Sequence, residues 1–379
     1  MTSPALDRQV PTVASVRIRP VIVPLHPPFV TASGVMASAP LVLVDVASDS
    51  GVVGHAYVCT YAPSVLPAMT KLLEDISGQL VGEPAAPKTV MGRIRSRLVL
   101  LGTPGLMDMA LAGLDMALWD VHARMSRLPL VRLLGGEPEP IKAYASFGMD
   151  GLQRAVEAAE RGVEAGFRAI KIKIGYPTLK QDLEVVRGVR RVIGADIDLM
   201  VDYNQALNVP EAIRRCHALD DEGLAWIEEP TLCEDLDGHA RIAEAIKTPL
   251  QLGENVWGPR GMMAMLSRRA SDLAMADLMK IGGVTGWLEA VSMCEAAGVP
   301  VSNHFYQEMS AHLLALSSCT HYLEYFGLAD AVLARASVPL GGLVKPDDLP
   351  GSGIEWDEDA VAHYTPIWHQ TENVGKELS

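Results

Sequence analysis

Cysteine is scarce in this chain of 379 residues, and the few that occur follow no metal-binding or disulfide pattern. The five cysteines stand far apart, without a Cys-x-x-Cys pair: Cys59, Cys216, Cys233, Cys294 and Cys319. An odd, sparse set in a long chain argues against a disulfide framework and against a cysteine-ligated zinc site. We therefore expect buried, reduced thiols and a cytoplasmic location.

Long apolar runs and an excess of positive charge are also missing. The longest apolar stretches, such as Leu41–Val44, fall far short of the roughly 20 residues that a membrane helix needs. The N-terminus has no apolar run behind a basic start, so we expect no signal peptide. With 32 basic and 46 acidic residues, the net charge is −14. Because nucleic acids and anionic membranes are bound by basic surfaces, we expect neither as a partner.

The composition is that of a soluble globular protein, with 49% hydrophobic and 21% charged residues. The length predicts two or three domains. Residues 1–12 are polar and contain two prolines, so we expect a flexible arm there. Residues 13–137 then combine strand-like and helix-like patterns, which predicts an N-terminal α+β domain.

Within that domain, Leu41–Ala47 and Val52–Tyr57 flank the turn-forming segment Ser48–Gly51, which predicts a β-hairpin. Val13–Val23 predicts a further strand, followed by a proline-rich turn at Pro24–Pro28. Helical periodicity comes next and predicts three helices, Ala68–Leu80, Val90–Leu101 and Met107–Met125.

From residue 138 to residue 340, short strand-like runs alternate with amphipathic helical segments. The predicted strands are Ile141–Phe147, Ala169–Ile174, Asp198–Tyr203, Leu224–Glu228, Leu250–Glu254, Leu273–Lys280, Val299–His304 and His321–Tyr325. The clearest helices are Leu152–Ala165, Leu179–Ile193, Val209–Asp221, Leu236–Ile246 and Leu288–Ala297. Eight strands with intervening helices predict an α/β fold with a parallel barrel. Residues 341–379 do not continue this alternation of strands and helices, and we expect them to pack back on the N-terminal domain.

Polar residues recur at the ends of these strands. Asp202, Glu228 and Glu254 follow one another at intervals of 26 residues. Asp277, His304 and Glu324 continue the series. Since each interval spans about one strand and one helix, we expect these side chains at a similar height on one mouth of the barrel, where catalytic residues lie.

Two lysines join them from the second strand. Lys171 and Lys173 alternate with isoleucines, so both lysines face the barrel interior. Taken singly, each of these polar residues has a structural explanation: Asp202 as a turn residue, the lysines on a solvated edge strand, and His304 as a core histidine paired with Asp277. Taken together, three carboxylates at one height predict an oxygen-ligand site for a hard divalent cation such as Mg²⁺.

These segments resemble the enolase superfamily, and within it the mandelate racemase subgroup. The resemblance extends from about Val13 to about Trp356, and its most specific motifs are Lys171–Lys173, Val201–Gln205, Trp226–Pro230, Gly253–Asn255, Lys280–Trp287 and Asn303–His304. It implies an N-terminal α+β capping domain and a (β/α)₇β modified TIM barrel. It also implies abstraction of a proton next to a carboxylate, with Mg²⁺ stabilising the enediolate, in a homo-oligomer that acts on a small carboxylate.

By this resemblance, Asp202, Glu228 and Glu254 bind Mg²⁺. Lys173 is the base on one face of the α-carbon, and His304, oriented by Asp277, is the base on the other.

The remaining roles concern the substrate carboxylate. Lys171 lies against it and lowers the pKa of Lys173, because an unperturbed lysine is a poor base at neutral pH. Glu324 is a protonated acid that bonds the other carboxylate oxygen. Asn204, Ser146 and Tyr61 are further candidates for substrate contacts.

Two bases on opposite faces suit racemisation or epimerisation of a 2-hydroxy acid. The lid expected at Pro24–Thr31 is largely apolar, which favours an apolar or aryl, mandelate-like side chain. An acid-sugar dehydratase of the same superfamily is the alternative, and a metal-binding barrel without catalysis is a weaker one. Cys59, Phe305 and Phe326 depart from the mandelate racemase pattern, so we expect a reshaped pocket.

Overall fold

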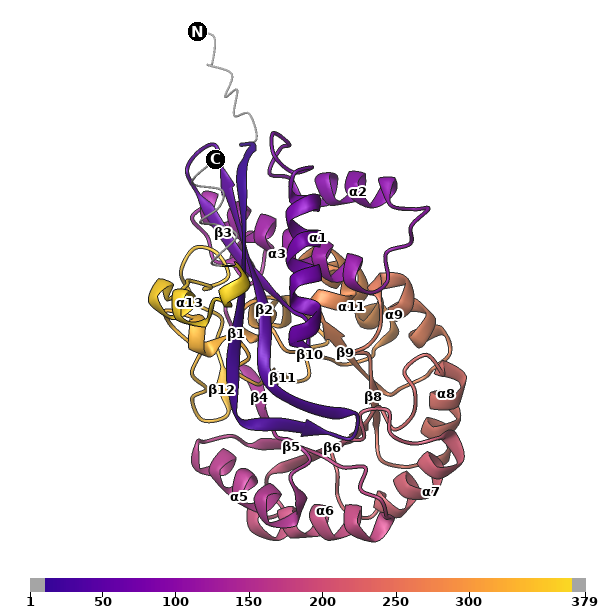
Figure 1. Ribbon diagram of the computed structural model, residues 1–379. Coiled ribbons are helices and arrows are strands. Elements are labelled where there is room, and N and C mark those ends of the chain that lie inside the picture. The colour runs from indigo at the N-terminus through magenta and orange to yellow at the C-terminus, as the bar shows by residue number, and fades with distance from the viewer. Residues whose placement is uncertain (1–10, 370–379) are drawn as a thin grey trace.

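The computed structural model describes residues 11–369, and its N-terminal part is built on a three-stranded antiparallel sheet (Figure 1). The strands lie in the order β1 (Val13–Thr31), β2 (Gly34–Ser48) and β3 (Val53–Cys59). The predicted hairpin is confirmed: the N–H of Ser48 donates to the carbonyl oxygen of Val52 at 2.9 Å. Gly51 takes the positive φ, +82°, that this turn requires.

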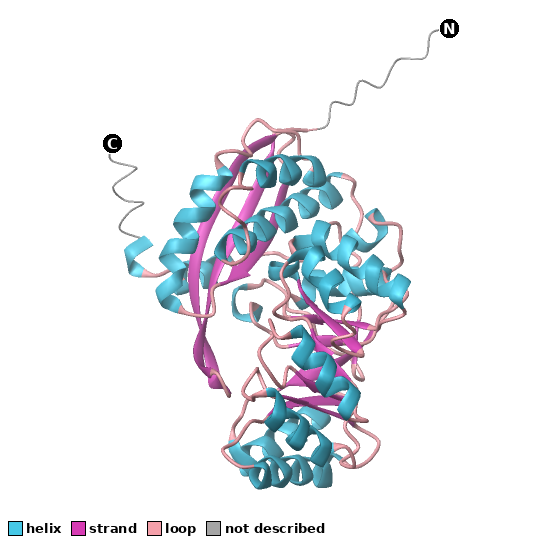
Figure 2. Cartoon of the chain, turned by 90° about the vertical axis from the view of Figure 1, so that its right-hand side faces the viewer, coloured by secondary structure: helices cyan, strands magenta, loops and turns pink. Residues whose placement is uncertain are grey.

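The predicted turn at Pro24–Pro28 is wrong. β1 pairs with β2 as far as Pro24, opposite Ser38, and the pairing resumes at Phe29, opposite Met36. Prolines lack the N–H that a ladder needs, so they interrupt the pairing within one strand without reversing the chain. The chain reverses after Thr31, whose Oγ1 accepts the N–H of Gly34 at 3.1 Å. β1 and β2 thus form one long hairpin whose tip extends beyond the sheet (Figure 2).

Helices cover this sheet and join it to the rest of the chain. They are η1 (Pro63–Val65), α1 (Leu66–Ser77), α2 (Pro87–Arg97), α3 (Leu106–Met125) and α4 (Leu130–Leu133). Prolines lie in the first turns of α1 and α2, where a missing N–H costs nothing. α3 is buried on most of its surface because it packs on β2 and β3 and also on α10 (Leu278–Ile281) and α11 (Gly283–Ala297).

Parallel strands form the second part of the molecule. They are β4 (Ile141–Ser146), β5 (Ala169–Lys173), β6 (Asp198–Asp202), β7 (Trp226–Glu228), β8 (Leu250–Leu252), β9 (Leu273–Asp277), β10 (Val301–His304) and β11 (Leu323–Tyr325). Neighbours follow chain order from β4 to β10, and β11 pairs with β4. The N–H of Glu324 donates to Asn303 Oδ1 at 2.8 Å, which links β11 to β10 and closes the barrel. The expected α/β fold, a parallel barrel with an N-terminal capping domain, is confirmed.

Helices follow the barrel strands on the outside. They are α5 (Gly151–Glu164), α6 (Leu179–Ile193), α7 (Val209–Leu219), α8 (Leu236–Ala245), α9 (Gly258–Ser267), α11 and α12 (Gln307–Leu316). The sequence pattern did not predict α9, α12 or the short α10. The strand expected over Leu273–Lys280 ends at Asp277, because Asp277 Oδ1 accepts the N–H of Lys280 at 2.9 Å and caps α10.

The C-terminal part of the described chain contacts both the barrel and the capping sheet. After η2 (Asp330–Val332), the strand β12 (Leu343–Val344) pairs antiparallel with β4. Farther on, Trp356 Nε1 donates to Asp45 Oδ1 at 2.6 Å, and α13 (Glu358–Tyr364) contacts β1. Residues 1–10 of the expected arm and residues 370–379 lie outside the described residues. No helix between residues 11 and 369 has the length and apolarity to cross a membrane.

Gly54 in β3 is a position where the packing of the capping domain leaves no room for a side chain. A Cβ atom there would lie 2.3 Å from Val121 N and 2.5 Å from Ala117 O on α3. We expect Gly54→Ala to lower the free energy of unfolding by about 1–3 kcal/mol, measured by denaturant titration. The matched control is Gly92→Ala on α2, where an added Cβ meets no atom within 4 Å, and there we expect a gain of about 0.5–1 kcal/mol. Equal effects at the two positions would contradict this packing argument.

Candidate active site

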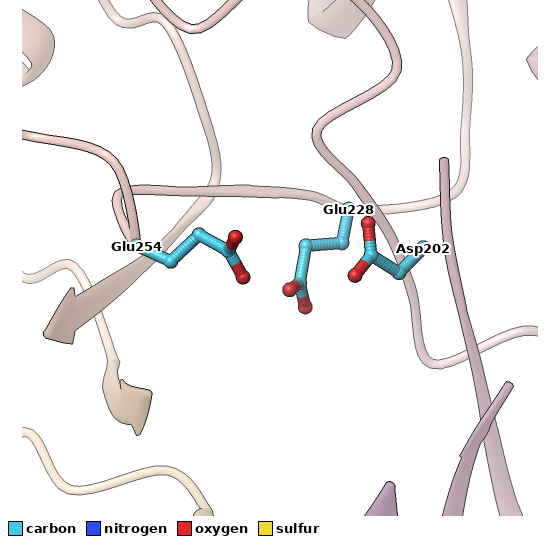
Figure 3. A group of neighbouring side chains, drawn as sticks. All are labelled: Asp202, Glu228 and Glu254. Carbon is cyan, nitrogen blue, oxygen red and sulfur yellow. The ribbon is translucent and has the colours of Figure 1, made fainter. Parts of the chain in front are cut away.

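Three carboxylates meet at the barrel mouth (Figure 3). Asp202 and Glu228 end β6 and β7, and Glu254 follows β8 by two residues. Asp202 pairs in register with Glu228, which puts the first two at the same height. One oxygen of each of the three carboxylates lies within 4.8 Å of the others, and all three side chains are buried. The structure therefore brings together the three residues that the sequence predicted as metal ligands.

The electrostatics of this cluster fit a cation. Burial and the neighbouring carboxylates raise the pKa of Glu228 to about 7, although Lys171 opposes the shift. Burial also raises the pKa of Glu254, but attraction to His304 and the nearby lysines lowers it more, so Glu254 stays ionised. Glu254 Oε2 accepts no hydrogen bond from the described residues. Closely placed carboxylate oxygens are the ligands that a hard divalent cation such as Mg²⁺ takes.

Both predicted lysines face this cluster from β5. Lys171 is fully buried, and its Nζ lies 2.9 Å from Glu228 Oε1 and 2.9 Å from Glu324 Oε1. Lys173 forms a close ion pair with Asp202. Burial lowers the pKa of Lys173, but the Asp202 carboxylate raises it more, so with the protein charges alone the net shift is upward. Lys171 does lower the pKa of Lys173, as the sequence predicts, but it repels Lys173 less than Asp202 attracts it, so the net shift without a metal ion is upward.

His304 and Asp277 form the second pair. They are register partners on β10 and β9, and His304 Nδ1 lies 2.6 Å from Asp277 Oδ2. His304 Nε2 lies 3.5 Å from Glu254 Oε2. Burial lowers the pKa of His304, but Glu254 and the hydrogen bond with Asp277 raise it more. Asp277 thus fixes the orientation of the His304 imidazole ring, and the other ring nitrogen, Nε2, points toward the carboxylate of Glu254.

Glu324 is buried at the end of β11, as expected, but its protonation state differs from the expectation. Burial raises its pKa, whereas the neighbouring Lys171 and His304 lower it more, so the net shift is downward. The carboxylate also accepts the N–H of Phe305 at 3.3 Å. These protein partners therefore favour the ionised form of Glu324, whereas the resemblance implies a protonated acid.

A cavity of about 400 Å³ opens between the barrel mouth and the tip of the β1–β2 hairpin. The tip forms its lid with Phe29, Thr31, Ser33, Gly34, Val35 and Met36. Lys173, His304 and Glu254 line it from the barrel side. Ser33 Oγ donates to the carbonyl oxygen of Asn204 at 2.8 Å, which holds the lid against the barrel. Both predicted bases therefore face one cavity, which the hairpin tip borders on the other side.

The three weaker candidates for substrate contact are placed differently. Asn204 lines the cavity, and its Nδ2 donates to Asp202 Oδ2 at 3.0 Å. Tyr61 also lines the cavity, from the loop after β3. Ser146 ends β4 in register with Lys171 and is not among the residues between 11 and 369 that line the cavity.

Of the residues that depart from the family pattern, Phe305 lines the cavity. Phe326 packs behind it, with its ring centre 5.0 Å from that of Phe305 and 4.6 Å from that of Phe29. Cys59 is fully buried, and its N–H donates to Tyr306 Oη at 3.2 Å. The aromatic residues therefore build one wall of the pocket, whereas Cys59 serves packing.

Sequence reasoning missed several polar residues of the site. Gln251 Nε2 donates to Glu228 Oε2 at 2.9 Å. Lys280 Nζ donates to Asn255 Oδ1 at 2.5 Å, and Asn255 Nδ2 donates to Glu229 Oε2 at 2.7 Å. Two features of the sequence could have indicated these residues. Gln251 is a polar residue inside a short apolar strand, and Lys280 follows Asp277 by three residues.

Comparison with known proteins places this site in a family. Residues 13–135 match the family model described as the mandelate racemase / muconate lactonizing enzyme N-terminal domain, and residues 154–360 match the enolase C-terminal domain-like model. The 3,6-anhydro-alpha-L-galactonate cycloisomerase of Streptomyces coelicolor is 32% identical, over 86% of this chain and 91% of the relative. The L-talarate/galactarate dehydratase of Salmonella typhimurium is 28% identical, over 76% and 73%.

Two solved structures are similar throughout. An enolase from Bradyrhizobium, complexed with magnesium and mandelic acid, has a TM-score of 0.92 at 41% identity, covering 95% of this chain and 100% of that one. A racemase from Streptomyces coelicolor with bound magnesium has a TM-score of 0.88 at 28% identity, covering 93% and 100%. The chain belongs to the enolase superfamily, in its mandelate racemase / muconate lactonizing enzyme group.

Proposed function

We propose that this protein removes the α-proton of a 2-hydroxy acid and returns a proton on the opposite face, and so racemises or epimerises its substrate. The observation that carries the proposal is that Lys173 and His304, the two candidate bases, line the same cavity. Lys173 reaches it from β5 and His304 from β10, on either side of the strands β6, β7 and β8 that lead to the three carboxylates. Two bases that approach a carbon from opposite sides invert its configuration.

The metal in this proposal is Mg²⁺, held by Asp202, Glu228 and Glu254. Their buried carboxylate oxygens suit a hard cation, and two similar structures contain magnesium. Bound there, the ion supplies a Lewis acid that stabilises negative charge on the substrate carboxylate.

The protein residues hold and move the protons. In its neutral form Lys173 Nζ takes the proton from one face of the α-carbon, while protonated His304 Nε2 donates a proton on the other; for the opposite enantiomer, neutral His304 accepts and protonated Lys173 donates. Asp277 keeps the His304 ring oriented through Nδ1. Lys171, held between Glu228 and Glu324, places a positive charge beside the reacting carboxylate.

The residues that line the cavity support the proposal that the substrate has an apolar or aryl side chain. Phe29, Val35 and Met36 on the lid and Phe305 on the barrel give it apolar walls. The similar Bradyrhizobium structure contains mandelic acid, a 2-hydroxy acid with an aryl side chain. The scarcity of cysteine and the family resemblance further support a cytoplasmic homo-oligomer.

A second candidate is dehydration of an acid sugar. One curated relative is named a dehydratase, and another a cycloisomerase of a sugar acid. The same bases serve that reaction when an acid also expels the β-hydroxyl.

Exchange of the α-proton tests the proposal. We expect a panel of 2-hydroxy acids in D₂O with Mg²⁺ to include members whose α-proton signal disappears from the NMR spectrum with inversion of configuration. A chelator is expected to stop the exchange, and added Mg²⁺ to restore it. A 2-keto-3-deoxy product would support the dehydratase instead, and no exchange by any acid would favour a metal-binding barrel without catalysis.

Replacement of either base separates the two faces. We expect Lys173→Ala to reduce α-proton exchange of one enantiomer by about 10²–10⁴-fold and His304→Asn to reduce that of the other, because each base serves one face. Initial exchange rates of the pure enantiomers in D₂O measure the effect. Exposed Lys180→Met provides a control outside the site. Equal losses for both enantiomers in each variant would refute the assignment of faces.

The pH profile reports the link between Asp277 and His304. His304 acts as a base only when its imidazole is neutral, and its hydrogen bond with Asp277 raises its pKa. Exchange of the enantiomer that His304 serves is therefore expected to increase with pH. Asp277→Asn removes the negative charge, and we expect it to move the apparent pKa of this increase to lower pH while lowering the maximal rate. An unchanged midpoint in the pH–rate profile would show that Asp277 does not act on His304.

A further inference from the structure

Gln251 is a fully buried polar residue to which the proposed proton transfers give no role. It lies on β8 as the register partner of Glu228 on β7. Register partners on neighbouring parallel strands point to the same side of a sheet, so both side chains lie inside the barrel. Gln251 is not among the residues between 11 and 369 that line the cavity. Any effect of Gln251 on the site is therefore exerted through Glu228.

Two neutral donors hold one oxygen of the Glu228 carboxylate. Gln251 Nε2 donates to Glu228 Oε2 at 2.9 Å, and Trp226 Nε1 donates to the same oxygen at 3.1 Å. An ionised carboxylate only accepts hydrogen bonds, so the amide of Gln251 turns its NH₂ group toward it. The other oxygen, Oε1, lies 2.9 Å from Lys171 Nζ. Donors on β5, β7 and β8 thus fix the plane of one predicted metal ligand.

The two neutral donors are themselves held by close packing. Trp226 lies in a buried cluster, with its ring centre 5.5 Å from that of Tyr144 and 5.7 Å from that of Tyr322. Met275 belongs to the same cluster, and its Sδ lies 3.7 Å from Gln251 Nε2. Closely packed side chains have few alternative conformations, so both donors are oriented before any ligand binds.

The chemistry of the amide suits a residue that orients a metal ligand. Gln251 Oε1 is buried and has no hydrogen-bond partner in the described part of the chain. An unpaired buried carbonyl is unfavourable, so packing alone would favour an apolar side chain of the same shape, such as methionine. An ammonium or guanidinium would hold the carboxylate but repel a cation beside it. A neutral N–H donor orients Glu228 without adding positive charge.

We propose that Gln251 is a positioning residue that fixes the Glu228 carboxylate and thereby sets the preference of the site for Mg²⁺ over a larger cation such as Ca²⁺. Mg²⁺ requires nearly octahedral ligands at about 2.0–2.1 Å, whereas Ca²⁺ accepts variable ligand numbers and angles at about 2.3–2.6 Å. A carboxylate that cannot turn favours the stricter ion, and a carboxylate free to turn loses that preference. The inference rests on the metal site of the proposed function, and not on its substrate or reaction.

Calorimetric titration of the full chain with Mg²⁺ and with Ca²⁺, after removal of bound metal with a chelator, tests this role without turnover. We expect Gln251→Met to weaken Mg²⁺ binding by about 10- to 100-fold, as is typical when an outer partner of a metal ligand is lost. We expect Ca²⁺ binding to weaken less, so that the preference for Mg²⁺ falls by about fivefold or more. Both constants come from one preparation, so a misfolded fraction changes the stoichiometry and not their ratio.

Gln307→Met on α12 is the matched control. Gln307 is a buried glutamine too, and its Nε2 donates to Asp330 Oδ1 at 3.1 Å instead of to a predicted metal ligand. We expect this variant to lower the thermal stability and to leave both metal affinities within about twofold of the wild type. If Gln251→Met does not fold, Gln251→Asn provides the same test, because it keeps an amide but withdraws its NH₂ group by one methylene.

Two results would overturn the inference. Unchanged affinities in the Gln251 variant would mean that Lys171 and Trp226 suffice to hold Glu228. Equal weakening of Mg²⁺ and Ca²⁺ would mean that Gln251 supports the site without setting its preference. Failure of the proposed function gives a different result, because the preference for Mg²⁺ then falls as expected but no 2-hydroxy acid exchanges its α-proton. A wild-type protein that binds neither cation would overturn both.

Discussion

Compensation of buried negative charge at the barrel mouth is the constraint on which the rest of the structure depends. Five carboxylates converge there, each at least nine-tenths buried: Asp202, Glu228, Glu254, Asp277 and Glu324. An isolated buried carboxylate costs several kcal/mol, so each needs a cationic or hydrogen-bonding partner. Lys171 and Lys173 provide two of these, and His304 a third. Part of the net charge of −14 is thus gathered where three carboxylates can hold a metal ion, and a bound cation would offset that charge for the anionic substrate that we propose.

The parallel register of the barrel delivers these partners side by side. Lys173 is opposite Asp202, and Asp202 is opposite Glu228, on three consecutive strands. Because side chains alternate along a strand, the isoleucines next to the lysines pack outward under the helices, and the lysines point inward. The capping domain then completes the site from outside the barrel: α3 packs on α10 and α11, and the β1–β2 tip covers the mouth.

Much of this arrangement was predictable because it depends on periodicity. Strand ends spaced by one β/α unit bring Asp202, Glu228 and Glu254 together, and this does not depend on the conformation of the segments between the strands.

Effects of tertiary context were not predictable. The prolines after Val23 leave the chain in one strand because β2 lies alongside to pair with it, and the strand at Leu273 stops early because Asp277 caps a helical turn. The pKa directions of Lys173 and Glu324 depend on distances of a few ångströms, which sequence spacing does not contain.

The reacting end and the side-chain end of the cavity are built by different elements. The barrel strands and the loops directly after them carry the proposed bases and the carboxylates, whereas the lid hairpin and Tyr61 belong to the capping domain. One fold can therefore serve racemases and dehydratases, since the lid can change without moving the bases. The α10 turn is the exception: Asp277 holds the His304 ring with Oδ2 and the backbone of Lys280 with Oδ1. The cavity wall formed by the α10 turn is consequently tied to the orientation of the His304 ring, because one aspartate side chain holds both.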